Sequence, residues 1–174
     1  HLIDHKRNYG KGAAIQTAQK LVKGDVVVIQ DGDLEYDPSD YNKLLKEISK
    51  GYKVVYGSRV LGKNRYLSKN FSSKLRIFFN HILTITSNIL NNQKLTDAHT
   101  CYKMFKSDIF KNIELKEKDF SFCPEITTKI GLENITIKEV PVKYKGRSYN
   151  EGKKINFIDG IKAIFTLFKY RFFL

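Results

Sequence analysis

Apolar side chains recur along the 174-residue chain at two spacings, one typical of helices and one typical of strands. Residues 26–30 and 53–57 are short runs rich in valine, which predict buried strands. Spacings of three and four residues predict a helix that opens at residues 8–12, a second over 41–48 and a long third over 72–90. A helix, strand, helix, strand order at these lengths is typical of parallel βαβ units and predicts an α/β fold.

The second half of the chain continues the alternation of helices and strands. A polar turn over 96–100 leads into an alternating strand, and helical patterns follow over 107–113 and 120–131. Residues 135–144 alternate as a strand, and Pro141 favours an edge position because proline has no N–H for the sheet ladder.

The last segment, 156–174, predicts a basic amphipathic helix that follows a partial globular domain over 1–155. Its apolar residues fall on one helical face, namely Phe157, Ile161, Ile164, Phe165, Phe168 and Phe172. We expect this face, which has basic residues beside it, either to pack on the core or to lie in a membrane interface. The two alternatives are nearly balanced, and the charge of +13 and the end Tyr170–Phe173 slightly favour the membrane. Charges interrupt every long apolar stretch before the ~20 residues that a transmembrane helix needs.

Composition narrows the class of protein. With 41% apolar residues the chain can bury the core of one domain. The excess of 31 basic over 18 acidic residues gives a charge of +13, which indicates an anionic partner: nucleic acid, an acidic membrane surface or a phosphorylated substrate. Two cysteines without metal-ligand spacing are typical of a reduced, cytosolic protein. No signal peptide is visible in these residues, and because the opening residues lack Met and an apolar stretch, we expect this chain to be cut from a longer one.

Carboxylates cluster directly after the first predicted strand. Asp31, Asp33 and Glu35 follow it at alternate positions, so an extended backbone would direct all three to one side. Oxygen ligands of this kind suit Mg²⁺ or Mn²⁺, which bind through carboxylates together with substrate phosphates. The alternative is a solvated acidic turn before a helix, because Asp37 and Pro38 form a good helix start.

Other polar residues are candidates for phosphate binding or proton transfer. Gly10 and Gly12, with Lys11 between them, open a helix whose first amides can take an anion, although a plain flexible turn has the same spacing. Arg59 follows the second strand and is placed to meet a phosphate. Asp97 and His99 are acid or base candidates, and for His99 a structural role is the simpler interpretation. Basic side chains also lie in two loops, over 60–70 and 146–154.

Together these segments resemble glycosyltransferase family 2, which has the GT-A fold, and within it the polyprenyl-phosphate sugar transferases such as dolichol-phosphate mannosyltransferase. The matching segments are Asn8–Gly12, Asp31–Glu35, Gly57–Arg59, the turn around Asp97, and 147–154. The resemblance implies a Rossmann-like, mixed and mostly parallel sheet with flanking helices. It implies that Asp31, Asp33 and Glu35 hold the cation, that Arg59, Lys69, Arg147 and Lys153 surround the phosphates, and that Asp97 lies beside the acceptor, with Asp97 and Arg147 as catalytic residues.

The activity implied is transfer of a sugar, mannose or glucose, from a nucleotide sugar to a polyprenyl or dolichyl phosphate with inversion, at the cytoplasmic face of a membrane. An alternative is a relative that acts on a polysaccharide or another glycan, in which Asp97 would have to act as a base. A basic nucleic-acid-binding domain is a remote alternative, because three acids at a strand end repel a phosphate backbone and the basic residues are not interleaved with aromatics.

The chain departs from the family pattern in three places. The family's early strands and its first acidic residues have no counterpart, so we expect the N-terminal part of the domain to be missing and this segment alone to transfer no sugar. The stretch His99–Lys103 stands where relatives commonly have Ser-Gly-Phe-Arg, which affects the acceptor assignment. Lys69 stands where an arginine is expected.

Overall fold

The computed structural model describes residues 1–61, 71–146 and 157–173. Its centre is a four-stranded mixed sheet in the order β1-β3-β2-β4. The strands are β1 (Val26–Ile29), β2 (Val54–Ser58), β3 (Lys103–Lys106) and β4 (Ile137–Pro141). β2 pairs with β4 in parallel, whereas β3 pairs antiparallel with both β1 and β2.

The sheet differs in one respect from the βαβ units that the sequence predicts. β1 and β2 run in the same direction, but β3 lies between them and runs against both. The apolar pattern alone cannot reveal this insertion, because it carries no information on strand direction. Pro141 ends β4 at an outer position of the sheet, as predicted.

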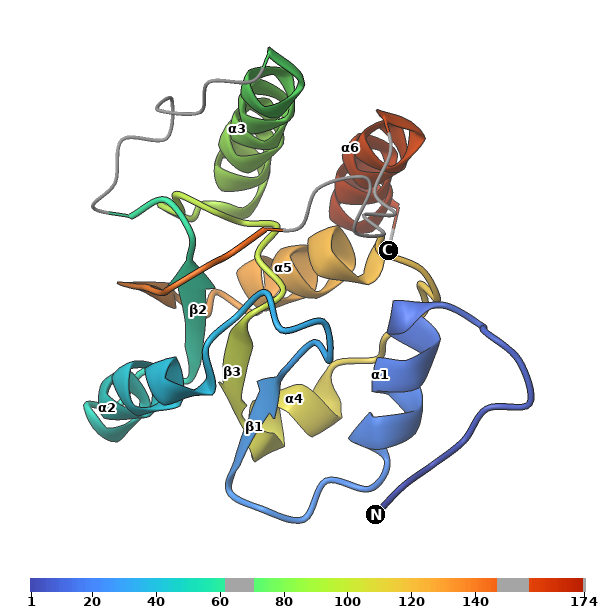
Figure 1. The fold of residues 1–174 in the computed structure, drawn as a ribbon, viewed down its shortest axis with the longest axis vertical. Helices are drawn as coiled ribbons and strands as arrows, with labels where there is room; N and C mark the ends of the chain where they lie inside the picture. The colour runs from blue at the N-terminus through green and yellow to red at the C-terminus, as the bar shows by residue number, and fades with distance from the viewer. Residues whose placement is uncertain (62–70, 147–156, 174) are drawn as a thin grey trace.

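Helices cover both faces of the sheet (Figure 1). The described helices are α1 (Lys11–Gln19), the short 3₁₀ helix η1 (Pro38–Asp40), α2 (Tyr41–Ser49), α3 (Phe71–Asn91), α4 (Ser107–Asn112), α5 (Phe122–Leu132) and α6 (Phe157–Phe172). η1 starts as the sequence predicts, with Asp37 accepting a 2.9 Å hydrogen bond from the Ser39 amide and Pro38 at the first helical position.

Alternate residues of the strands build two separate cores. On one face Val54, Tyr56 and Phe105 pack against α5 residues such as Ile126, and the Tyr56 hydroxyl lies 3.0 Å from the Thr127 hydroxyl. On the other face the intervening strand residues pack against Leu44 and Ile48 of α2. Each fully buried Val, Leu, Ile or Phe side chain stabilises the fold by about 1.5–3 kcal/mol. The cores on the two faces therefore fix the sheet, and with it the position of the sheet edge.

α6 does not pack as its apolar face suggested. The side chains that it turns toward the protein are Ala163, Thr166, Leu167 and Tyr170, which are buried. The predicted face is exposed: Phe165 is 69% exposed and Phe172 61%, and Ile161, Ile164 and Phe168 are exposed as well. The side chain of Phe157 lies outside the described residues. The interpretation in which this face packs on the core is therefore wrong, and α6 is apolar on two sides.

Gly10 and Gly12 are required by close packing at the start of α1. A Cβ atom on Gly10 would collide with the Lys118 carbonyl oxygen, and one on Gly12 with that of Glu117. Gly10 also has a φ of 98°, which favours glycine. The Ala13 amide donates a 3.0 Å hydrogen bond to the Lys118 carbonyl, so one of the first amides of α1 is already satisfied. The glycines thus join α1 to residues 117–118, which neither sequence interpretation included.

This packing predicts that adding one methyl group destabilises the fold at Gly12 but not at Gly24. Gly12→Ala should lower the free energy of unfolding by about 1–3 kcal/mol, because backbone atoms cannot move aside as a flexible side chain can. Gly24→Ala is the matched control, since its Cβ would meet nothing nearer than 3.8 Å, and it should change stability by less than about 1 kcal/mol. Urea denaturation of both variants measures the difference, and equal stabilities would contradict the packing role.

Candidate active site

The predicted site residues gather at one edge of the sheet because of strand direction. β1, β2 and β4 end at this edge, and the antiparallel β3 begins there. The acidic turn after β1, Arg59 after β2 and the turn that precedes β3 therefore meet at one place. In open α/β sheets this carboxyl edge is where ligands bind.

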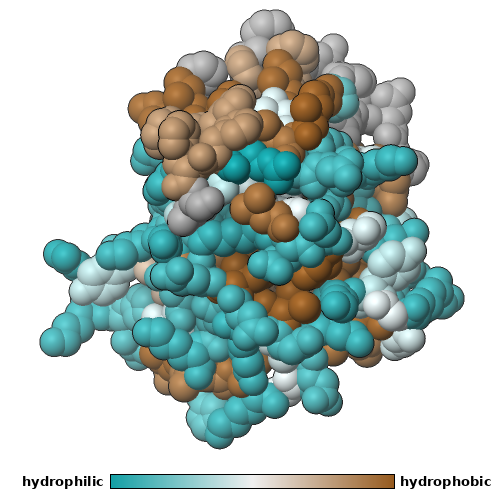
Figure 2. Space-filling model, turned by 180° about the vertical axis from the view of Figure 1, so that it is seen from behind, coloured by the Kyte–Doolittle hydropathy of each residue, from teal (hydrophilic) through white to brown (hydrophobic). Residues whose placement is uncertain are grey.

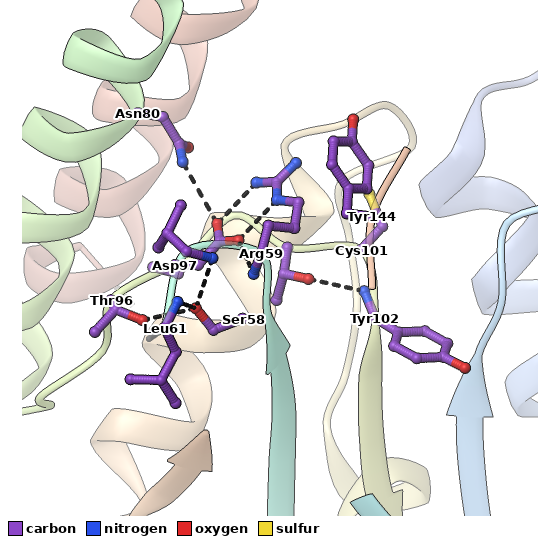
Figure 3. A network of polar contacts seen from close by, with 12 residues as sticks. Ser58, Arg59, Leu61, Asn80, Thr96, Asp97, Cys101, Tyr102 and Tyr144 are labelled. Atoms are coloured by element: carbon purple, nitrogen blue, oxygen red, sulfur yellow. Dashed lines mark hydrogen bonds and ion pairs between the residues drawn. The ribbon is translucent and has the colours of Figure 1, made fainter. Parts of the chain in front are cut away.

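Arg59 and Asp97 form the central ion pair of this edge (Figure 3). The Arg59 Nε and one terminal nitrogen each donate to a different oxygen of the Asp97 carboxylate at 2.7 Å, and the Arg59 amide donates to the same carboxylate at 3.1 Å. Asn80 of α3 adds a longer contact of 3.4 Å. Burial alone would raise the pKa of Asp97, but the charge and hydrogen bonds of Arg59 outweigh it and lower the pKa to about 2.

A second polar cluster ties the Asp97 turn to the sheet. The Glu139 carboxylate of β4 accepts from the Thr96 amide at 2.7 Å, the Thr96 hydroxyl at 2.8 Å and the Asp97 amide at 2.9 Å. The Thr96 hydroxyl also lies 2.7 Å from the Ser58 hydroxyl at the end of β2 (Figure 3). Asp97 is thus held through its backbone as well as through its carboxylate.

The three predicted metal ligands do not converge as an extended strand would direct them. β1 ends at Ile29, residues 31–35 form a turn, and Leu34 has a φ of 60°. Asp31 pairs with the Lys11 ammonium, the Asp33 carboxylate accepts from the Glu35 amide at 3.1 Å, and Glu35 accepts from the Tyr144 hydroxyl at 2.9 Å. Within residues 1–61, 71–146 and 157–173, no group of three or more His, Cys, Asp or Glu side chains is arranged to hold a metal ion.

Lys11 rather than its flanking glycines reaches the site. Its ammonium pairs with Asp31 and lies 5.6 Å from the centre of the Phe122 ring. The Lys11 side chain is only 15% exposed and that of Asp31 20%, so the pair is partly shielded from water. A partly buried pair of this kind keeps more of its attraction than an exposed one.

Of the remaining predicted residues, three lie outside the described part of the chain and His99 is half-buried. Lys69, Arg147 and Lys153 lie outside the described residues. His99 has a buried Nε2 with no hydrogen-bond partner among the described residues. Burial, reinforced by Lys103, lowers the pKa of His99 to about 4, so its ring is neutral at pH 7.

Sequence reasoning missed the residues that support the pair. Glu139, Thr96, Asn80 and Tyr144 have no spacing that marks them, because their partners lie far away in the chain. Tyr144 places its ring 5.3 Å from the Arg59 guanidinium carbon and donates to Glu35, so it joins the pair to the acidic turn. Glu139 lies between Ile137 and Val140 in a strand that also contains Lys138, so its charge alone did not mark it.

The chain is similar in sequence to a known protein family. The profile described as glycosyl transferase family 2 matches residues 1–114. The chain belongs to glycosyltransferase family 2. The predictions of this family and of an α/β fold are therefore confirmed.

Relatives of this family 2 chain include proteins from archaea and eukaryotes. Protein MJ1222 of Methanocaldococcus jannaschii is 28% identical over 97% of the chain and 71% of its own length. The dolichyl-phosphate beta-glucosyltransferase ALG5D of Trichomonas vaginalis is 27% identical over 99% of the chain, which spans 53% of that protein.

A solved structure shares the fold. Glucosyl-3-phosphoglycerate synthase of Mycobacterium tuberculosis, crystallised with Mn²⁺, UDP-glucose and phosphoglyceric acid, matches with a TM-score of 0.58 at 15% identity. The match covers 92% of this chain and 54% of the synthase. The chain therefore spans about half the length of ALG5D and of the synthase.

The Arg59–Asp97 pair predicts a pH dependence of stability. Because the folded pKa of Asp97 is depressed to about 2, its stabilisation is present above the unfolded value near 3.8 and is lost as the pH falls toward 2. Asp97→Asn leaves Arg59 with an uncompensated charge and should cost about 3 kcal/mol at pH 7. We expect the difference from wild type to shrink by about 2 kcal/mol between pH 5 and pH 2.

Denaturant titrations at several pH values measure this dependence. Asp108→Asn, at an exposed aspartate in the first turn of α4, is the control and should remain within about 0.5 kcal/mol of wild type throughout. A penalty for Asp97→Asn that stays constant down to pH 2 would contradict the ionised pair.

Proposed function

We propose that this protein is a glycosyltransferase that transfers mannose or glucose from a nucleotide sugar to a polyprenyl phosphate with inversion. Membership of family 2 supports the reaction type. The name of the relative ALG5D, a dolichyl-phosphate beta-glucosyltransferase, supports the acceptor class. The support from the molecule itself is the state of Asp97.

Asp97 is a poor proton acceptor in this arrangement. Both of its carboxylate oxygens accept from Arg59, and its pKa of about 2 lies far below the value that a general base needs near neutral pH. A hydroxyl acceptor requires deprotonation, whereas a phosphate acceptor is already an anion. The geometry therefore supports an acceptor that attacks without a base.

The proposed reaction is a single displacement. A phosphate oxygen of the acceptor attacks the anomeric carbon, the bond from that carbon to the diphosphate breaks, and its electron pair leaves with the nucleoside diphosphate. Arg59 has five N–H donors, of which Asp97 occupies two, and a guanidinium held in this way is suited to phosphate oxygens. Lys69, Arg147 and Lys153 belong to the same proposal as phosphate-binding residues, and Asp97 and Arg147 are its catalytic residues.

Asp31 and Asp33 are the residues that would hold Mg²⁺ or Mn²⁺. Their carboxylates are hard ligands in one turn at the sheet edge, and Asp31 already balances the charge of the Lys11 ammonium. The synthase of known structure contains Mn²⁺ together with UDP-glucose. When bound, such an ion neutralises the charge of the departing diphosphate. Glu35 belongs to the same proposed ligand set, and its carboxylate also accepts a hydrogen bond from the Tyr144 hydroxyl.

The reaction is tested with the full-length protein that contains these residues, a panel of nucleotide sugars and a short polyprenyl phosphate, with and without Mn²⁺. We expect transfer that depends on the metal and falls at least about 100-fold in Asp31→Ala. Asp108→Ala, at an exposed aspartate of α4, should retain wild-type turnover. Unaltered turnover in Asp31→Ala would remove the metal assignment, and transfer only to hydroxyl acceptors would overturn the acceptor class.

We further propose that the exposed apolar face of α6 contacts a membrane surface, where a polyprenyl phosphate resides. Figure 2 shows apolar side chains gathered at the end of the molecule that α3 and α6 form. The exposed apolar side chains of α3 and α6 include Phe78, Phe79, Ile161, Phe165, Phe168 and Phe172. Among the described helices, none has both the length and the apolarity needed to cross a bilayer. A contact in the interface plane fits these observations and the charge of +13.

Flotation with anionic vesicles tests this contact. Phe165→Ser with Phe168→Ser should weaken vesicle binding at least about 10-fold, because each phenylalanine contributes about 1.5–3 kcal/mol when buried. Leu45→Ser removes a comparably exposed apolar side chain from α2 and should bind as wild type does. Equal flotation of all three proteins would exclude α6 as the contact.

A further inference from the structure

Glu139 occupies an unusual position for a carboxylate. It lies inside β4, is half-buried and pairs in register with Tyr56 of β2. An ionised group costs free energy to bury unless hydrogen bonds replace its hydration. Glu139 obtains three such bonds, and all three come from Thr96 and Asp97.

The groups that donate to Glu139 belong to the turn that carries Asp97. One Glu139 oxygen accepts from the Asp97 amide, so the carboxylate fixes the backbone of the very residue whose side chain holds Arg59. The other oxygen accepts twice from Thr96, whose hydroxyl also contacts Ser58, the residue that precedes Arg59. Both halves of the Arg59–Asp97 pair are thereby tied to one carboxylate.

We propose that Glu139 is a positioning residue for the transfer reaction, which sets the place of the Arg59 guanidinium through Thr96 and Asp97. The inference rests on the proposed function for its catalytic consequence, and on the hydrogen bonds alone for its structural part. Glu139 contacts no reacting group itself. It affects the reaction indirectly, because moving a charged group that stabilises the transition state by about 1 Å lowers the rate of the reaction.

The kinetic test is a double-mutant cycle in the full-length protein. Glu139→Gln keeps the size of the side chain but turns an N–H toward the amides of the turn, and it should lower kcat/KM about 10-fold. Arg59→Lys should lower it about 100-fold, since lysine lacks the paired donors. The double variant should be no worse than Arg59→Lys alone. Costs that multiply, or wild-type turnover in Glu139→Gln, would overturn the proposal.

A second readout requires no activity. In the 174-residue chain, the Arg59 Nε–H proton should exchange slowly with water because Asp97 accepts it, and Glu139→Gln should speed this exchange at least about 10-fold. Glu133→Gln, at the exposed residue that follows α5, is the matched control and should leave exchange unchanged. Unchanged exchange in Glu139→Gln would refute the positioning role whatever the reaction is.

A third variant guards against a fold defect. Thr96→Val removes the hydroxyl bonds to Glu139 and Ser58 with little change in shape and leaves the carboxylate in place. It should show the same coupling to Arg59→Lys and faster exchange of the Arg59 proton. If the wild-type protein transfers no sugar while both variants speed this exchange, the proposed function fails and the structural part of the inference stands.

Discussion

The buried ion pair between Arg59 and Asp97 is the interaction on which the rest of this site depends. Two charges removed from water stabilise a fold only when geometry and surrounding hydrogen bonds compensate their lost hydration. Here Arg59 contributes two side-chain bonds and one backbone bond to a carboxylate that is fully buried. The result is a fixed guanidinium at a sheet edge, which is a suitable electrostatic element for substrates that carry phosphate groups.

Strand direction explains why this pair exists. If β3 ran parallel to its neighbours, it would begin at the opposite edge, and the turn that contains Asp97 would lie far from Arg59. Because β3 is antiparallel, the turn before it reaches the edge where β1 and β2 end. The long connection through α3 returns the chain to this edge, and the fold converts residues 59 and 97 into neighbours.

The sequence predicted what depends on local pattern and missed what depends on tertiary approach. Val26–Ile29, Arg59 at the end of β2 and Asp97 in a turn follow from hydrophobic runs and from turn chemistry. The packing role of Gly12 could not be predicted, because the Glu117 carbonyl that requires it is remote in the chain. The extended backbone expected for the acids at 31, 33 and 35 is a turn instead, because β1 ends at Ile29 and an apolar pattern does not determine where a strand ends. The exposed face of α6 was recognised, but not its second, buried face.

The two outer strands of the sheet, β1 and β4, differ in how readily their free edges can pair with another strand. β4 ends in Pro141 and carries charged side chains, features that discourage further pairing. β1 is a run of valines and isoleucine, and on the side away from β3 no described strand lies opposite its backbone. Growth of the sheet is therefore directed to one side only. When this 174-residue chain is produced by itself at high concentration, self-association should begin at β1 rather than at β4.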